Sequence, residues 1–565
     1  MEYDKFPRRD GEQHKKHAQE YANRESKERD EFFTKHSARW FELVRLPYFD
    51  PVRMTVIDPM HCFLLGIIKT QWFNAWIQTN ILRQKTAKVD RELDQIHKLL
   101  STFEMPSWVA RLPDQVGYPA GGSLTSDEWK GLALVFCPIA IPLIWEEWYP
   151  KNMKRHEKEN ESWAKREQAR VRRLAAGKAA QNGKDEEPPA RPKDVPMHPD
   201  DADNFLNLAA ALKIILGRSI NDADIPRAKE LLNKYLLGFL EIHPKHVKPS
   251  HHWVTHIFEQ LEDYGPVYGF WTFLFERLNK VLKSYSTNNH GDGEIEISFF
   301  RAFLRDTELR TMLTNLLART SESDELPSAE DAILYEAVKS IIATDSDTRG
   351  TVASLASEID DIAQQAGTRF SLSLAASSSL HLDQQKYLLH FYQTAYPHAH
   401  IVSATSYSSS SPNFLGSHAR FHNYAIVDGR RIVASDSRVY APNSIIQAEI
   451  NNKRYVGQVH SIITHWQKGV DVDICLLEVR WFREAIDFEC RHWTRYPELE
   501  IYFWDFNKFL DSMKDGPSRF IPIGSILSQA CRLKVMRHVE DPKINKQVEK
   551  PFWVTIGLTR DVQVV

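Results

Sequence analysis

Two short motifs in this sequence contain side chains of the types that bind metal ions. In DPMH, Asp58 and His61 are three residues apart at the start of an apolar stretch, so they can share a metal ion or a hydrogen bond. In HHWVTH, His252 and His256 are one helical turn apart and can face one cation. An N-cap aspartate with a helix-lining histidine, and an ordinary polar helix face, explain the same spacings without a metal.

A single carboxylate, Glu276, lies in the aromatic run FWTFLFERLNK that follows the histidine pair. It could form an ordinary i, i+4 ion pair with Lys280. It could instead hold a divalent cation, because carboxylates are the ligands that Mg²⁺ prefers, and Arg277, Lys280 and Lys283 would then face phosphate groups. One acid does not make a two-metal site, so the pattern alone leaves both interpretations open.

A second basic cluster, KREQARVRRLAAGK (165–178), contains Arg170, Arg172 and Arg173. The formal net charge of the chain is -3, so any attraction to nucleic acid must come from such local clusters. Contact with DNA and a solvated helix face are both compatible with this composition.

The bulk composition favours a soluble protein of a reducing compartment. Five cysteines are scattered among 565 residues without a CxxC pair, which argues against a disulfide framework. The longest apolar run, LALVFCPIAIPLIW, is too short to span a bilayer and contains two prolines, so we expect no membrane segment. The sequence has no Walker loop, GxGxxG, GxSxG or kinase signature.

Changes in composition and period divide the chain into six predicted segments and indicate an α+β multidomain protein. These are a charged N-terminal helical segment (1–45), a segment with the DPMH motif and following helices (46–150), a charged and disordered linker (151–200), a helical domain (201–320), a loose Ser-rich segment with short helices (321–412) and a small all-β, barrel-like domain (413–565). Within the second segment, VRMTVID is strand-like, and Ser126 is the expected N-cap of a helix beginning DEWKG. Strand spacing in the last segment suggests an SH3-like or BAH-like barrel.

The stretch RWFELVRLPYFDPVRMTVIDPMHCFLLGIIKTQWF, together with the later HHWVTH to VLKSYSTNNHGDGEIE, resembles the CACTA (En/Spm) transposases of mushroom-forming fungi. The likeness runs from about Tyr3 to about Phe300. It implies a DDE enzyme on an RNase H-like fold with a large helical insertion, acting on the DNA of transposon ends in the nucleus. Two aspartates from strands and a glutamate from a later helix would hold Mg²⁺ or Mn²⁺ there.

The resemblance also assigns roles to individual side chains. It implies that the DxMH element and the later histidine pair hold a structural zinc ion, which makes Asp58, His61, His252 and His256 the expected ligands. Glu276 is then the expected third catalytic acid, with Glu128 as the alternative.

The family carries both catalytic aspartates upstream of the segment that here begins YDKFPRRD, at the first residues of this chain. We therefore expect a truncated or decayed transposase that does not cut or join DNA by itself. The alternative is a nuclear DNA-binding or chromatin-binding protein without catalysis, and a third hypothesis treats both motifs as packing only. A homo-oligomer is compatible with each of these, and no small-molecule substrate is expected.

Overall fold

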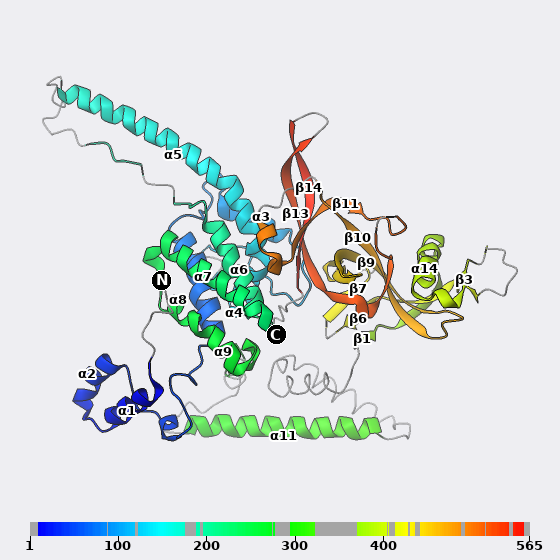
Figure 1. The fold of residues 1–565 in the computed structure, drawn as a ribbon, viewed down its shortest axis with the longest axis horizontal. Helices are drawn as coiled ribbons and strands as arrows, with labels where there is room; N and C mark the ends of the chain where they lie inside the picture. The colour runs from blue at the N-terminus through cyan, green and yellow to red at the C-terminus, as the bar shows by residue number, and fades with distance from the viewer. Residues whose placement is uncertain are drawn as a thin grey trace. The chain divides into compact units, whose positions relative to one another are not determined.

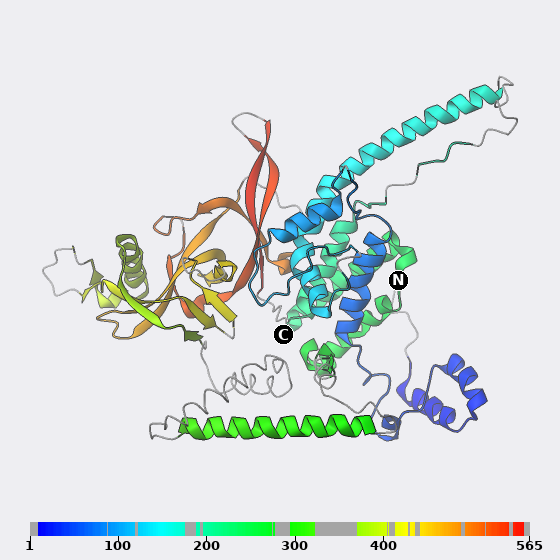
Figure 2. The same cartoon turned by 180° about the vertical axis from the view of Figure 1, so that it is seen from behind.

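The computed structural model describes residues 9–87, 89–118, 122–175, 188–192, 196–217, 219–273, 275–276, 279, 294–322, 370–403, 405, 413–427, 430–435, 441–486, 492–514, 516–541 and 546–558. The chain forms two compact units, of which the first combines Met1–Phe270 with Thr368–Val564 and the second is Trp271–Gly367. The first unit contains both predicted motifs, helices from the N-terminal half and a large antiparallel sheet from the C-terminal half (Figures 1 and 2). This confirms the α+β class.

Helices form most of the N-terminal half. Their bounds are α1 (Gly11–Ala22), α2 (Ser26–His36), η3 (Met60–Ile68), η4 (Thr70–Ile77), α3 (Glu92–Ser101), α4 (Ser126–Gly131), η6 (Leu132–Phe136), α5 (Cys137–Ala175), α6 (Asp201–Ile215), α7 (Ile225–Ile242), α8 (Ser250–Trp253), η9 (Val254–His256) and α9 (Ile257–Tyr264). The second unit contains α11 (Glu294–Glu322), and α14 (Leu382–Ala395) belongs to the strand-rich C-terminal part of the first unit.

The apolar stretch that follows DPMH forms the buried helices η3 and η4, which have π-helical turns. The N-cap predicted for α4 is wrong by one residue, because Thr125 takes that position. The Thr125 hydroxyl accepts the N–H of Glu128 at 3.4 Å, and a carboxylate oxygen of Glu128 accepts the N–H of Thr125 at 2.6 Å. Ser126 is the first residue inside the helix.

The strand predicted at 52–58 is wrong, since these residues form turns and an irregular segment. The alternate residues Val52 and Val56 are both exposed, so no sheet face covers them. The N–H of Ile57 instead donates to the Gln260 side-chain oxygen at 3.1 Å. In a sheet, a neighbouring strand would form the hydrogen bonds of this backbone. Here a side-chain amide forms one of them instead.

No strand is present in the described residues of 46–150, where the resemblance implied part of an RNase H-like core. Two isolated bridges occur there, between Thr86 and Val89 and between Glu104 and Arg532. The second bridge ties the helical region directly to the sheet.

The described strands lie between residues 370 and 557. Their bounds are β1 (Phe370–Leu372), β2 (Ala375–Ser379), β3 (Ile401–Val402), β4 (Asn413–Phe414), β5 (His418–His422), β6 (Tyr424–Val427), β7 (Arg430–Val433), β8 (Ile445–Ile450), β9 (Lys453–Trp466), β10 (Asp473–Glu484), β11 (Ile501–Phe509), β12 (Phe520–Pro522), β13 (Ile526–Asp541) and β14 (Lys546–Gly557).

The largest sheet has the strand order β12-β10-β11-β14-β13-β8-β9-β5-β2, with a further pairing between β10 and β9. That pairing joins two strands from opposite sides of the order, so β8, β9, β10, β11, β14 and β13 form a closed ring of antiparallel neighbours. Closure satisfies the backbone groups that open edges would expose. Side chains of α14 such as Leu388 and Phe391 pack with Ile463, Leu476 and Phe520 of the sheet.

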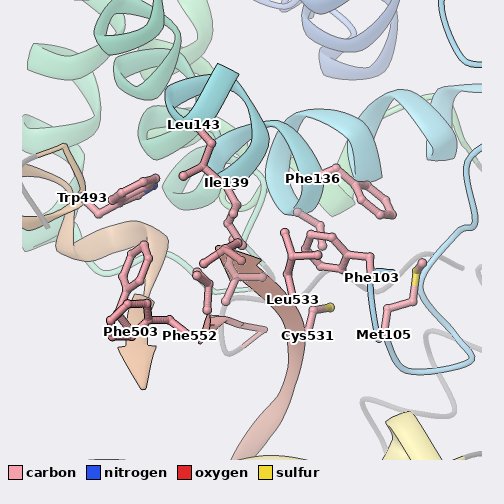
Figure 3. Packing of buried hydrophobic residues seen from close by; sticks show 14 of the residues in the cluster. Phe103, Met105, Phe136, Ile139, Leu143, Trp493, Phe503, Cys531, Leu533 and Phe552 are labelled. Atoms are coloured by element: carbon pink, nitrogen blue, oxygen red, sulfur yellow. The ribbon is translucent and has the colours of Figure 1, made fainter. Parts of the chain in front are cut away.

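The N-terminal helices and the sheet share one apolar core (Figure 3). Ile139 and Leu143 of α5 and Phe136 of η6 lie against side chains of the strands, including Leu533 and Phe552. Ile139 and Leu533 are fully buried. Because these residues are about 400 positions apart in the chain, neither part buries this surface without the other.

The apolar stretch of α4, η6 and α5 contributes to this core. The continuous helix Ser126–Ala175 is long and apolar enough to cross a membrane by length and composition, but 83% of its most apolar window is buried inside the protein. Burial of that kind is what the core helix of a folded domain shows.

A charged cluster around His492 also joins the two parts. Its Nδ1 lies 2.8 Å from a carboxylate oxygen of Asp203 on α6, and its Nε2 lies 3.2 Å from Glu146 on α5. Arg495 pairs with Asp203 at 2.6 Å, and Arg537 of β13 pairs with Glu146. Hydrogen bonds to Asp203 and then to Glu146 raise the pKa of His492 to about 9, against the opposing effect of burial.

Replacing Ile139 by alanine should lower the free energy of unfolding by about 2–5 kcal/mol, because it leaves a cavity in the shared core. Amide hydrogen exchange of β13 and β14 should accelerate together with that of α5. Leu527→Ala is the control, since Leu527 is 41% exposed and should change stability little. Unchanged protection of the strands in the Ile139 variant would show that the two parts are stable separately.

The His492 cluster predicts a loss of stability at alkaline pH. The folded pKa of about 9 exceeds the ordinary value of 6.5, so the contribution is complete below pH 6.5 and disappears as the pH rises through 9. His492→Gln should remove roughly 1–3 kcal/mol at pH 6 and little at pH 10. Urea unfolding of both proteins across this range measures the difference, and a difference that does not depend on pH would contradict the assignment.

Candidate functional site

His61 and His252 are 191 residues apart in sequence, yet the segments that carry the two motifs lie side by side. The guanidinium of Arg53 forms two hydrogen bonds with Asp263 on α9, at 2.6 and 2.8 Å. The Gln260 amide accepts from Ile57 at 3.1 Å and donates to the carbonyl of Thr55 at 3.4 Å. These contacts fix the segment that leads into DPMH along α9.

The helices that carry the two motifs, η3 and α8, also pack closely. A side-chain carbon at Gly66 of η3 would lie only 3.0 Å from the Cβ of Ser250, the first residue of α8. Glycine therefore allows η3 and α8 to approach at this point. The sequence contained the motifs, but only the fold shows that their elements are neighbours.

Asp58 is engaged with its own motif. One carboxylate oxygen accepts the N–H of His61 at 2.9 Å and lies 2.5 Å from His61 Nδ1, and the other accepts the N–H of Met60 at 3.3 Å. The side chain of Asp58 is 15% exposed and that of His61 is 50% exposed. A proton on Nδ1 that is donated to Asp58 makes Nε2 the nitrogen with which His61 can bind a metal ion. The N-cap interpretation and the shared hydrogen bond are therefore both present.

The histidine pair lies where α8 passes into the tighter turn of η9. The rings of His252 and His256 have their centroids 5.2 Å apart and are perpendicular. His252 is half-buried and His256 is exposed. The preceding residue, His251, was not singled out in the sequence, yet it is buried, and burial lowers its pKa to about 4.

The four predicted zinc ligands belong to elements that lie together, but they are not arranged as a finished site. Among the residues that the structure describes, no three His, Cys, Asp or Glu side chains are grouped so that they could hold a metal ion. Imidazole nitrogens and a carboxylate oxygen are nevertheless suitable ligands for zinc. The exposed ring of His256 can change rotamer without disturbing the core.

Glu276 belongs to the second compact unit, where it is exposed and its N–H donates to the carbonyl of Thr272 at 2.9 Å. Its predicted DNA-binding neighbours Arg277, Lys280 and Lys283 lie outside the described residues. The structure therefore gives no geometry for a cation site at Glu276.

Glu128, the alternative third acid, is used in the capping box of α4. Its carboxylate accepts both the N–H and the hydroxyl of Thr125, at 2.6 and 2.9 Å. Two residues further along, Lys130 is fully buried, with its amino group 3.5 Å from the hydroxyl of Tyr268. Neither the burial of Lys130 nor this contact could be inferred from the local sequence.

The predicted basic cluster lies on the exposed C-terminal part of α5. Arg170 forms two hydrogen bonds with Glu167, at 2.6 and 2.9 Å, which partly neutralises its charge. Arg172 and Arg173 are exposed in the last turn of the described helix. Arg172 and Arg173 are therefore accessible to the phosphate backbone of a nucleic acid.

Comparison of the chain with protein-family models, with curated proteins and with solved structures finds no match in any of the three.

Proposed function

We propose that this chain is a DNA-binding protein related to the CACTA (En/Spm) transposases and that its two motifs hold a structural zinc ion. The observation that carries the proposal is the packing of the DPMH segment along α8 and α9, through Gln260, Arg53 with Asp263, and Gly66. If the two motifs resembled a metal site only by chance, we would not expect contacts between remote segments to hold them together.

The chemistry of the side chains suggests how the ion would be held. Nε2 of His61 and the rings of His252 and His256 are the ligands, and Asp58 keeps His61 in the required tautomer through the bond to Nδ1. Asp58 is an orienting partner in this arrangement, although its second oxygen can still approach the ion. The zinc ion would cross-link two segments of the chain that are otherwise joined by the hydrogen bonds of Gln260 and Arg53 and by the close packing at Gly66.

The catalytic part of the proposal concerns Glu276 as the third acid of a DDE site for Mg²⁺ or Mn²⁺. The proposal assigns one acid to that site, and charge stabilisation at a scissile phosphate needs several converging ligands. We therefore propose DNA binding without cleavage for these 565 residues, in the nucleus. An RNase H-like core and an SH3-like or BAH-like identity of the closed β ring belong to the same proposal.

Zinc binding predicts a stabilisation that depends on the histidine pair. At a free zinc concentration about 100-fold above the dissociation constant, the free energy of unfolding should rise by about 2.7 kcal/mol relative to the protein in EDTA. His256→Ala should lose most of this gain, whereas His398→Ala, at an exposed position on the sheet side of the chain, should keep it. Differential scanning fluorimetry with and without zinc measures the shift, and an equal shift in both variants would contradict the site.

DNA binding predicts a strong dependence on salt. The logarithm of the binding constant should fall linearly with the logarithm of the salt concentration, and Arg172→Ala with Arg173→Ala should reduce the slope by about 1–2. The matched control removes two cations elsewhere, through Lys98→Ala with Lys514→Ala, which are 71% and 81% exposed.

The same preparations test the catalytic part. With Mg²⁺ or Mn²⁺ the protein should not nick supercoiled DNA above the level of Glu276→Gln. Nicking that disappears in Glu276→Gln would show that the protein is an active nuclease. In the binding assay, the absence of salt-dependent binding would contradict DNA as the partner.

A further inference from the structure

A polar cleft with a volume of about 520 Å³ is lined by residues of α6 and α7. A short connection joins the two helices, which lie side by side and run antiparallel (Figure 1). The side-chain amide of Asn204 on α6 donates to the carbonyl of Tyr235 on α7 at 3.2 Å, which fixes their alignment. Asp200, one turn before Asn204, is therefore level with the C-terminal end of α7, where Glu241 lies.

The lysine and arginine side chains that line this cleft have acidic partners. The pairs are Arg495 with Asp203 at 2.6 Å, Arg227 with Glu498 at 2.7 Å, and Lys234 with Glu230 at 2.6 Å. Because the protein itself compensates these positive charges, the cleft offers an anion little net attraction.

Two carboxylates at one end of the cleft lack such compensation. Glu241 is exposed, and no cation pairs with it among the residues that the structure describes. The nearest basic group to the carboxylate of Asp200 is Nδ1 of His198, at 3.9 Å. That nitrogen accepts the backbone N–H of Asp200 at 3.2 Å, so it carries no proton that could neutralise the carboxylate. Both acids are therefore available to a cation from solution.

Asn204 adds a buried amide oxygen to the same end of the cleft. The residue is 6% exposed, and its side-chain nitrogen is used in the bond to Tyr235. A side-chain carbon at Gly238 would collide with Oδ1 of Asn204, and both residues line the cleft, so glycine leaves room for this oxygen there. Within the described part of the chain, no group donates to Oδ1. A ligand that supplies an N–H at this point therefore gains affinity.

We propose that this cleft binds a small aliphatic amine, whose ammonium group lies between Asp200, Glu241 and Oδ1 of Asn204. An ammonium group has three donors and no acceptor, which matches a set of acceptors at one end. The side chains of Leu231 and Ile242 also line the cleft and can contact the alkyl chain. A volume of about 520 Å³ is far larger than an inorganic cation needs, so a chain of several carbons can be accommodated.

Binding is tested by titrating the full chain with pentylamine, 1-pentanol, inorganic phosphate and calcium in separate experiments. Ligand-observed NMR or calorimetry should show saturable binding of pentylamine at one site. Pentylamine should bind roughly ten- to hundredfold more tightly than 1-pentanol, the ratio that hydrogen bonds to charged groups supply. Equal affinity for the amine and the alcohol would overturn the proposal, as would binding of phosphate or calcium without binding of the amine, or no saturable binding of the amine.

Two variants remove the negative charges with little change in side-chain size. Asp200→Asn and Glu241→Gln should each weaken pentylamine by about three- to tenfold and leave 1-pentanol unchanged. Both positions are exposed, and the side chain of Asp200 forms no capping hydrogen bond, so the fold should be kept. Glu540→Gln makes the same change at an exposed position on β13 and should have no effect.

A third variant tests the amide oxygen. Gly238→Ala places a carbon against Oδ1 of Asn204, so this oxygen must move and the amine should bind more weakly. Thermal unfolding of each variant shows whether the fold is intact. Unchanged affinity for pentylamine in a folded protein with both Asp200→Asn and Glu241→Gln would place the amine elsewhere and refute the site.

Discussion

The core shared by α5 and the closed ring of strands is the constraint on which the first compact unit depends. Ile139, Phe136 and Leu143 come from one half of the chain and Leu533, Val554 and Phe552 from the other. Polar contacts surround this core, including the backbone bridge between Glu104 and Arg532 and the bond from the buried amino group of Lys213 to the carbonyl of Gly557 at 2.8 Å. Apolar burial supplies most of the stabilisation, and the polar contacts determine how the two halves are aligned.

This core also explains how the candidate site is kept in place. The helix η3 that begins at DPMH packs against α4 and α8, and α4 continues through η6 into α5. The position of His61 is thus connected, through packed helices, with the sheet at the far end of the chain. The contacts of Gln260 and Arg53 then hold the segment before DPMH along α9. A rigid support of this kind is what a site made from remote segments requires.

Some of the fold could be predicted from the sequence because burial leaves a periodic pattern. The apolar stretches of η3, α6 and α7 have helical spacing, and the runs that became β9 and β10 are rich in β-branched and aromatic residues. The long strands β13 and β14 were not predicted. Charged residues such as Lys534, Arg537 and Glu549 interrupt their apolar pattern, and the ladder between the two strands, rather than alternation, defines them.

The errors and gaps at the candidate site have similar causes. VRMTVID alternates like a strand, but Gln260 satisfies its backbone from 200 residues away, and no local rule shows this. The sequence left the role of Asp58 open between a cap, a hydrogen bond and a ligand, and the structure shows the first two. His251 had no distinguishing local signal, because its importance comes from burial against Phe239.

The central claim is that His61, His252 and His256, from two remote segments, bind one zinc ion. X-ray absorption spectroscopy at the zinc edge of the zinc-loaded chain tests it most directly. We expect one tightly held zinc per chain with imidazole nitrogens at about 2.0–2.1 Å, and the loss of one imidazole ligand in His61→Ala. A spectrum without imidazole ligands, or one that is identical in wild type and His61→Ala, would contradict it.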